Sequence, residues 1–225
     1  MRCFTKASSA PCVRRRSGRK RNFSAWRRGD EGTASARTTL TITATSVRIG
    51  ECRFSYAYVF SPRKNEDGTD GKYSVQLLIP KTDAVAKKLI DAAIEAAKQA
   101  GISSKWNGKL PPASKLHLPL RDGDEEYPDD PTYEGMWFMN TGSVQKPGIR
   151  VLENGQMSEA LDGDDFYSGC WGAAVVNFFA YANSGNVGVS AGLNNVIKTR
   201  DDERLSGGRS AETDFGDMVG GDCLD

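Results

Sequence analysis

An alternating stretch between Phe166 and Lys198 constrains the fold more than any other part of the chain. In steps of two, one face of its first half is wholly apolar, formed by Ala174, Val176, Phe178, Ala180 and Ala182. The other face begins apolar and ends with an amide between rings, in Ala173, Val175, Asn177, Phe179 and Tyr181. The turn sequence NSGN follows, and VGVSAG then has the small side chains of a partner strand. The pattern predicts a β-hairpin with one face in a core, whose second face is either buried as well or contacts a ligand.

Four further strands and a second hairpin are predicted from the same period of two. The strands cover 38–50, 52–60, 72–80 and 135–143, and the hairpin covers 148–157 with Asn154-Gly155 at its turn. In the second strand, one face collects Phe54, Tyr56, Tyr58 and Phe60. In the third strand, the inward face collects Tyr73, Val75, Leu77 and Ile79.

One helix is predicted over 83–100, capped by Thr82 and stopped by Gly101. Its buried stripe consists of Ala86, Leu89, Ile90, Ala93, Ile94 and Ala97. Five prolines and an acidic run make 103–134 a long irregular loop. The order predicts a mainly β fold, a five-stranded barrel of the oligonucleotide/oligosaccharide-binding (OB) type with an inserted hairpin and one helix between its third and fourth strands. Another α+β sheet is the alternative.

Charge is segregated along the 225 residues although the net charge is only +1. Residues 1–37 hold eleven Lys and Arg against two acids, whereas 199–225 hold three against eight. We therefore expect a basic leader at 1–37, a binding domain at 38–205 and a flexible acidic tail at 206–225. Three interpretations of the leader stay open: a basic arm that binds phosphates, a transit peptide, or a disordered extension.

Cysteine and histidine usage argues against a metal centre or a disulfide framework. The five cysteines are scattered without a CxxC pair, and His117 is the one histidine. Free thiols in a reducing, cytoplasmic compartment are expected, and no run approaches the roughly 18 apolar residues of a membrane span.

Catalysis has little support in the sequence. Two acidic clusters could hold Mg²⁺ for a nuclease, at Asp122, Asp124, Glu125, Glu126, Asp129 and Asp130, and at Asp162, Asp164 and Asp165. Both lie among Gly and Pro, where solvated loop acids are usual. His117 has no triad partner at an informative spacing, and no phosphate-binding glycine motif is present. We therefore expect a protein that is not an enzyme and uses no cofactor or metal.

Aromatic and basic residues interleave along the predicted strands, a combination that holds single-stranded nucleic acid through base stacking and phosphate contacts. The candidate nucleic-acid-binding residues are Arg48, Arg53, Tyr56, Tyr58, Lys72, Tyr73, Lys105, Trp106, Lys109, Trp137, Lys146, Arg150, Asn177, Phe179 and Tyr181. Aromatic residues at strand spacing are usually core, so Phe54 and Phe60 are expected to be buried. Trp106, between two lysines in SKWNGK, is expected to be exposed.

Several strings together resemble one family: GKYSVQLLIPK before the helix, LRDGD in the long loop, FYSGCWG, NFFAYANSGNVGVSAGLNNVIK, and GGRSAETDF near the end. Over residues 38–217 the chain resembles the tailed-phage single-stranded DNA-binding proteins. The basic leader is not part of that pattern, and the C-terminus ends in Cys-Leu-Asp rather than on an aromatic residue.

The resemblance implies an OB-type barrel that binds single-stranded DNA without sequence preference in phage replication or recombination, in the cytoplasm of the host cell. It also implies that the acidic tail meets replication or recombination proteins, for which Asp214, Phe215 and Asp217 are the candidates. From the charge pattern, the tail is alternatively expected to compete for the DNA groove. The alternative function is a phage structural or assembly protein whose barrel binds protein. Oligomeric state, site size and DNA against RNA stay open.

Overall fold

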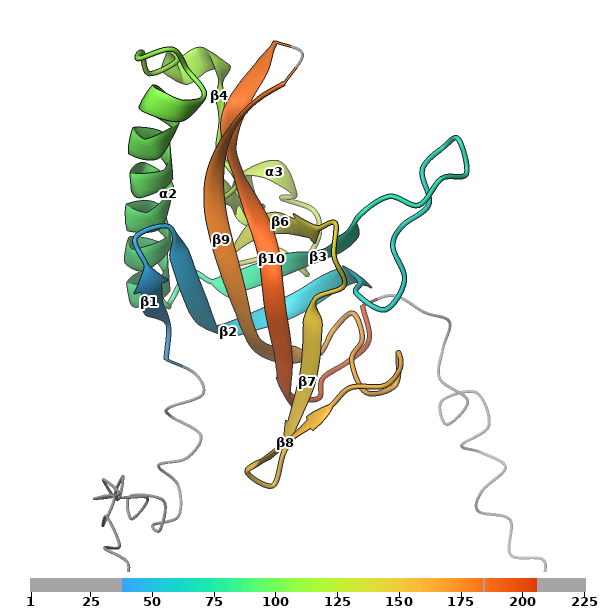
Figure 1. Ribbon diagram of the computed structural model, residues 1–225. Helices are drawn as coiled ribbons and strands as arrows, with labels where there is room; N and C mark the ends of the chain where they lie inside the picture. The colour runs from blue at the N-terminus through green and yellow to red at the C-terminus, as the bar shows by residue number, and fades with distance from the viewer. Residues whose placement is uncertain (1–37, 184, 206–225) are drawn as a thin grey trace, which may run out of the picture.

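Five strands close into a barrel at the centre of the computed structural model, which describes residues 38–183 and 185–205 (Figure 1). They are β2 (Ser46–Tyr58), β3 (Tyr73–Pro80), β6 (Met136–Ser143), β9 (Trp171–Asn183) and β10 (Asn186–Arg200). Hydrogen bonds join them in the ring β2–β3–β6–β10–β9–β2, in which only the β6–β10 pair is parallel. The predicted mainly β, OB-like barrel is confirmed.

Shorter elements decorate the barrel. The predicted hairpin is β7 (Gly148–Glu153) with β8 (Gln156–Glu159), and β7 lies parallel to the lower half of β10. Asn154 and Gly155 at its turn both have positive φ, as a two-residue hairpin turn requires. The long loop contains a 3-10 turn (Ala113–Lys115), β4 (Leu116–His117), β5 (Arg121–Asp122) and α3 (Gly123–Glu126).

The start of the sheet differs from the prediction. The strands expected at 38–50 and 52–60 are instead the short arm β1 (Leu40–Thr43) and one long strand, β2, which runs across the expected break. Gly50, taken as a break between strands, is a buried position inside β2, and its N–H donates to the Thr39 hydroxyl. A glycine interrupts a side-chain pattern without ending the backbone ladder, and this is why the sequence misplaced the boundary.

The single long helix α2 (Ala84–Ser104) therefore follows the second barrel strand, not the third. Its N-cap is Asp83, whose carboxylate accepts from the Ala86 N–H, so the expected Thr82 cap is wrong. The helix also continues through Gly101. A Cβ at this position would lie 2.4 Å from the Ala180 Cβ, so Gly101 permits close packing and does not stop the helix.

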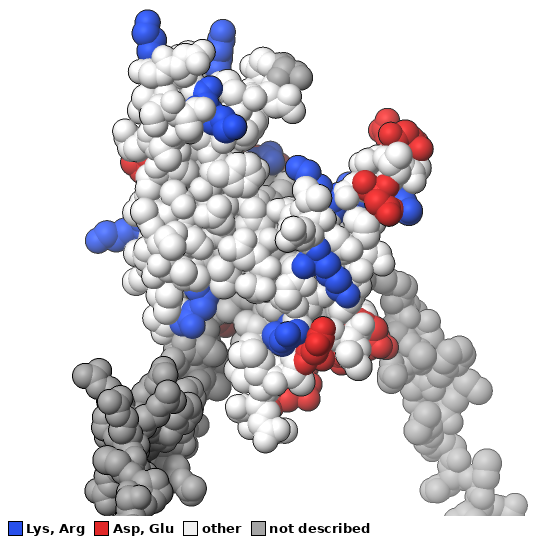
Figure 2. Space-filling view, in the orientation of Figure 1, with Lys and Arg blue, Asp and Glu red and all other residues white. Residues whose placement is uncertain are grey.

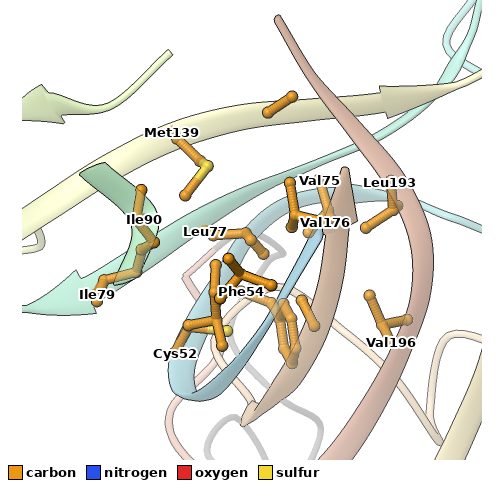
Figure 3. Packing of buried hydrophobic residues seen from close by; sticks show 14 of the residues in the cluster. Cys52, Phe54, Val75, Leu77, Ile79, Ile90, Met139, Val176, Leu193 and Val196 are labelled. Carbon is orange, nitrogen blue, oxygen red and sulfur yellow. The ribbon is translucent and has the colours of Figure 1, made fainter. Parts of the chain in front are cut away.

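The barrel interior and the apolar side of α2 form one core (Figure 3). Cys52, Phe54, Leu77, Met139 and Val176 point into it from four strands, and Ile90 enters from the helix (Figure 3). Phe54 is fully buried as predicted, whereas Phe60 is half-buried.

The thiols of Cys52 and Cys170 are buried and free, and burial raises the pKa of both, that of Cys170 to about 11. Within the described parts of the chain, no helix combines the length and apolarity needed to cross a membrane.

Candidate nucleic-acid interface

Tyrosine rings gather in a hollow of about 360 Å³ on the outer face of β3 and β6. We call this hollow the tyrosine groove. Its lining residues are Tyr56, Tyr58, Arg63, Ser74, Val75, Gln76, Tyr127, Asp130, Tyr133, Asn140 and Thr141. The alternation of β3 explains the floor: Val75, Leu77 and Ile79 face the core, which leaves Ser74 and Gln76 outward.

A bulge at the end of β2 places two of these rings on the surface. The pairing with β3 shifts between Ser55 and Tyr58, and Tyr56 adopts a left-handed φ of 47°. Tyr56 is consequently 57% exposed and Tyr58 41% exposed, whereas Phe54 stays in the core. The expectation of a single face shared by Phe54, Tyr56 and Tyr58 is wrong, because a strand period cannot register an extra residue.

Hydrogen bonds fix the floor of the tyrosine groove. The Tyr133 hydroxyl donates to Gln76 Oε1 over 2.7 Å, and Gln76 Nε2 donates to Asn140 Oδ1 over 3.1 Å. Burial, with a smaller contribution from neighbouring Tyr56, raises the pKa of Tyr133 to about 12. Tyr133 therefore stays a neutral donor, and its ring supports Tyr127, stacked on it at 4.3 Å between centroids.

An ion-pair cluster holds the loop that carries Tyr127 and Tyr133. The Lys81 ammonium binds the carboxylates of Asp122 and Asp124, and Asp124 also accepts from the Gly135 N–H. These contacts lower the pKa of Asp124 and raise that of Lys81. Two of the six acids weighed as a possible magnesium cluster thus close a loop, and no group of metal ligands forms anywhere in the described ranges 38–183 and 185–205.

Cations lie at the open end of the tyrosine groove. A second hollow shares Arg63 and Ser74 with it and is also lined by Lys64 and Lys72. Lys64 pairs with Asp70, while Arg63 and Lys72 form no ion pair with any carboxylate in the described part of the chain. Lys146 lies over the ring of Phe60, 5.7 Å from its centroid.

Acidic side chains are absent from four of the barrel strands. β3, β6, β9 and β10 contain no Asp or Glu, and Figure 2 shows the broad face over β9 and β10 without red atoms, above an acidic lower end. A polyanion can therefore approach these four strands without repulsion from a carboxylate on them.

The structure brings only part of the predicted set together. Tyr56, Tyr58 and Lys72 line the two joined hollows, and Tyr73 is half-buried beside them on β3. Phe179 and Tyr181 lie on the β9–β10 hairpin, and Lys105 and Lys109 are exposed just beyond the end of α2.

Other predicted residues hold the fold. Arg48 donates to the Thr38 carbonyl, Arg53 to the carbonyls of Gly169 and Glu203, and Arg150 to that of Ile149. Asn177 accepts from the Thr45 hydroxyl. The ring of Trp137 is flanked by the ammonium groups of Lys81 and Lys87, at 4.8 and 5.0 Å.

Trp106 corrects the sequence-based expectation most clearly. Only 6% of it is exposed, and its indole N–H donates to the Tyr181 carbonyl over 3.1 Å. The residue lacks strand or helix periodicity because it folds back from the end of α2, so its burial comes from a contact 75 positions away.

Sequence reasoning missed Arg63, Gln76, Tyr127, Tyr133 and Asn140, which line the tyrosine groove. Tyr127 and Tyr133 carried one signal, as aromatic residues in an otherwise proline-rich and acidic loop. The others are polar residues in a loop or on strands, and only the pairing of β3 with β6 shows that Gln76 and Asn140 are neighbours.

The last described residue, Leu205, lies beside the tyrosine groove. It packs against Leu78, Tyr133 and Phe138, and its N–H donates to the Ser168 carbonyl. The segment before it is anchored by Asp202, which accepts from the Trp171 indole, and by Asp201, which accepts from Tyr167. The predicted tail residues Asp214, Phe215 and Asp217 lie outside the described residues.

Comparison with known proteins gives consistent matches. Residues 45–224 match the family model described as Enterobacter phage Enc34, ssDNA-binding protein. Protein p50 of Acyrthosiphon pisum secondary endosymbiont phage 1 is 29% identical over 184 residues, which are 76% of this chain and 93% of that protein.

Solved structures of phage single-stranded DNA-binding proteins also resemble this chain. The single-stranded DNA-binding protein from bacteriophage Enc34 in complex with ssDNA is 30% identical, with a TM-score of 0.63 over 73% of this chain and 91% of that chain. The single-stranded DNA-binding protein gp2.5 of bacteriophage T7 shares the fold, with a TM-score of 0.52 over 81% of this chain and 99% of that chain, at 16% identity.

Proposed function

This chain belongs to the phage Enc34 ssDNA-binding protein family, and we propose that it binds single-stranded DNA without sequence preference in the tyrosine groove. The observation that carries the proposal is the set of exposed rings in that groove. Tyr56, Tyr58 and Tyr127 are each at least 40% exposed and surround one hollow. Unpaired bases stack on such rings with about 1–3 kcal/mol each, regardless of base identity.

Polar groups in the groove floor supply the remaining base contacts. The Gln76 and Asn140 amides each retain hydrogen-bonding atoms after their mutual bond. Because Tyr133 already binds Gln76, the pair is held in place before any ligand arrives. A rigid floor of this kind lowers the entropy lost on binding.

Phosphates contact the cations at the open end of the groove in this proposal. Arg63 and Lys72 are the first candidates, because no carboxylate in the described residues pairs with them, and Lys146 is the next. Asp130, Glu66 and Asp70 line the same hollows, so the local charge is mixed. Since the contacts to phosphate are ionic, we expect the affinity for DNA to fall markedly as the salt concentration rises.

The acidic tail is proposed to regulate this site. Residues 206–225 contain five acids against Arg209, and they follow Leu205, which packs against a cluster that includes Tyr133 of the groove. In this proposal their negative charge competes with DNA phosphate for the same cations. The same segment, with Phe215 between Asp214 and Asp217, is the proposed contact for replication or recombination proteins of the phage.

A titration of the full chain with fluorescein-labelled oligo-dT tests the proposal. Anisotropy should rise on binding, and log affinity should fall linearly with log salt, with a slope of about −0.7 for each phosphate contact. No binding at low salt would refute it and favour a barrel that binds protein in phage structure or assembly. Incubating the same oligonucleotide with the protein and Mg²⁺ should give no cleavage product, since we propose no catalysis.

A further inference from the structure

The last five described residues, 201–205, run from the end of β10 to the apolar cluster beside the tyrosine groove (Figure 1). We call this segment the clasp. We infer that the clasp positions the rings and the floor of the tyrosine groove, so that the groove loses affinity for DNA when the clasp leaves the barrel. The inference rests on the proposed function and concerns how that site is held in shape.

Three side chains bind the first two residues of the clasp. The Trp171 indole N–H donates to the Asp202 carboxylate over 2.6 Å. The Asp201 carboxylate accepts from the Tyr167 hydroxyl over 2.9 Å and from the buried Lys198 ammonium over 2.8 Å. The start of the clasp is therefore held by charge-assisted hydrogen bonds, which are stronger than bonds between neutral groups.

The backbone of the clasp lies directly on the loop before β9. Arg53 donates both to the Gly169 carbonyl of that loop and to the Glu203 carbonyl of the clasp. Gly169 has a φ of +119°, and a Cβ at this position would collide with the Glu203 carbonyl oxygen. Only glycine permits this close approach, so the clasp has a specific place on the barrel.

The end of the clasp supports the floor of the tyrosine groove. Leu205 packs against a cluster that includes Tyr133 and Phe138. Tyr133 in turn stacks on Tyr127 and donates to Gln76, as described above. When Leu205 leaves, this cluster is opened to water on one side, and the support for both groove tyrosines is weakened.

Ser168 links the clasp to the bulge in β2. Its carbonyl accepts from the Leu205 N–H over 2.9 Å, and its hydroxyl accepts from the Ala57 N–H over 3.0 Å. Ala57 lies between Tyr56 and Tyr58, the two exposed rings of the bulge. A displacement of Leu205 therefore reaches the backbone that carries these rings, through a residue that is itself buried.

The clasp gives the tail a way to act on the groove without touching DNA. Residues 206–225 continue directly from Leu205, so a protein that binds them and lifts the clasp would loosen both links at once. Because coupling between two sites is reciprocal, bound DNA and a docked clasp stabilise each other.

The charge of the clasp gives the inference a distinctive sign. Residues 201–205 contain three acids against one arginine, a net charge of −2. By charge alone, losing the clasp would tighten the binding of a polyanion. Loss of position has the opposite effect, because each stacked base that is lost weakens binding about fivefold or more.

Affinity for labelled oligo-dT, measured on full-chain variants, tests the inference. Asp201→Ala/Asp202→Ala removes two negative charges together with the acceptors that anchor the clasp. We expect its affinity to fall about fivefold or more, whereas charge alone predicts a rise. Glu153→Ala/Glu159→Ala is the matched control, because it removes the same charge from the β7–β8 hairpin and should not weaken binding.

A second set of variants keeps the test decisive where the double variant fails to fold. Leu205→Ala should weaken binding, and Leu205→Met, which keeps an apolar side chain of similar volume, should restore most of it. Leu161→Ala shortens a leucine that is 78% exposed and should bind as the wild type does. Urea unfolding identifies the conditions under which each variant is fully folded, and the titrations are made there.

Amide hydrogen exchange separates positioning from a general loss of stability. In Leu205→Ala the Ala57 N–H should exchange faster than in the wild type, whereas the amides of β7 and β8 should exchange at the wild-type rate. If the wild type binds no oligonucleotide, the proposed function fails. If it binds and the folded clasp variants bind equally well or more tightly, or their Ala57 amide exchanges as in the wild type, only this inference fails.

Discussion

Replacing Tyr56 by glycine should separate the conformational cost of its left-handed backbone from the free energy gained when a base stacks on its ring. Tyr56 has φ +47° and is 57% exposed, so its ring makes little use of the core. A left-handed conformation costs a residue with a Cβ about 1–2 kcal/mol, a cost that glycine lacks. Glycine in turn loses about 0.5–1 kcal/mol more backbone entropy on folding.

The two terms partly cancel, so Tyr56→Gly should leave the free energy of unfolding unchanged or raise it by up to about 1.5 kcal/mol. Loss of one stacked base, at about 1–3 kcal/mol, should weaken DNA binding about fivefold to 150-fold. Stability is measured by urea unfolding and affinity by oligo-dT anisotropy. Tyr56→Phe is the matched control, because it keeps the ring and the strain, and should bind as the wild type does.

Two results would refute this reasoning. Wild-type affinity in Tyr56→Gly would show that the ring does not contact DNA, so that the strain has no binding function. A loss of more than about 1 kcal/mol of stability would show that the ring packs more than its exposure indicates. The predicted combination, weaker binding in an equally stable protein, is what strain retained at a binding site requires.

Four further predictions follow from the described contacts. Arg63→Ala and Lys72→Ala should each reduce the log–log salt slope of binding by about 0.7, and an unchanged slope would remove that residue from the phosphate contacts. Deleting 206–225 should tighten DNA binding at low salt, whereas equal or weaker affinity would contradict a competing tail. Trp106→Phe should lower the free energy of unfolding by about 1 kcal/mol through the lost indole hydrogen bond, without changing the affinity for short oligo-dT. The pKa of Tyr133 is raised to about 12 in the fold, so its contribution to stability is fully present below pH 10 and is lost between pH 10 and 12. The free energy of unfolding of Tyr133→Phe should therefore fall less over that range than that of the wild type. Identical alkaline unfolding curves for the two proteins would contradict this.

The site was only partly accessible to sequence reasoning, for identifiable reasons. Tyr56 and Tyr58 were predicted as nucleic-acid-binding residues, but their exposure comes from a bulge that no alternation pattern registers. Arg48 and Arg53 had the right chemistry, yet backbone carbonyls bind them in the fold. A count of rings and cations cannot distinguish these cases, because the distinction depends on which groups a side chain meets across the sheet.

Local chemistry alone determined the strand-rich character of the fold, the β9–β10 hairpin and the buried stripe of α2, since each follows from a period of two or of 3.6 residues. Tertiary structure decided the rest. It brought Tyr127 and Tyr133 over β3 and buried Trp106 against the β9 backbone. These are contacts between residues far apart in the chain, and such contacts are set by strand pairing and barrel closure, which no local period encodes.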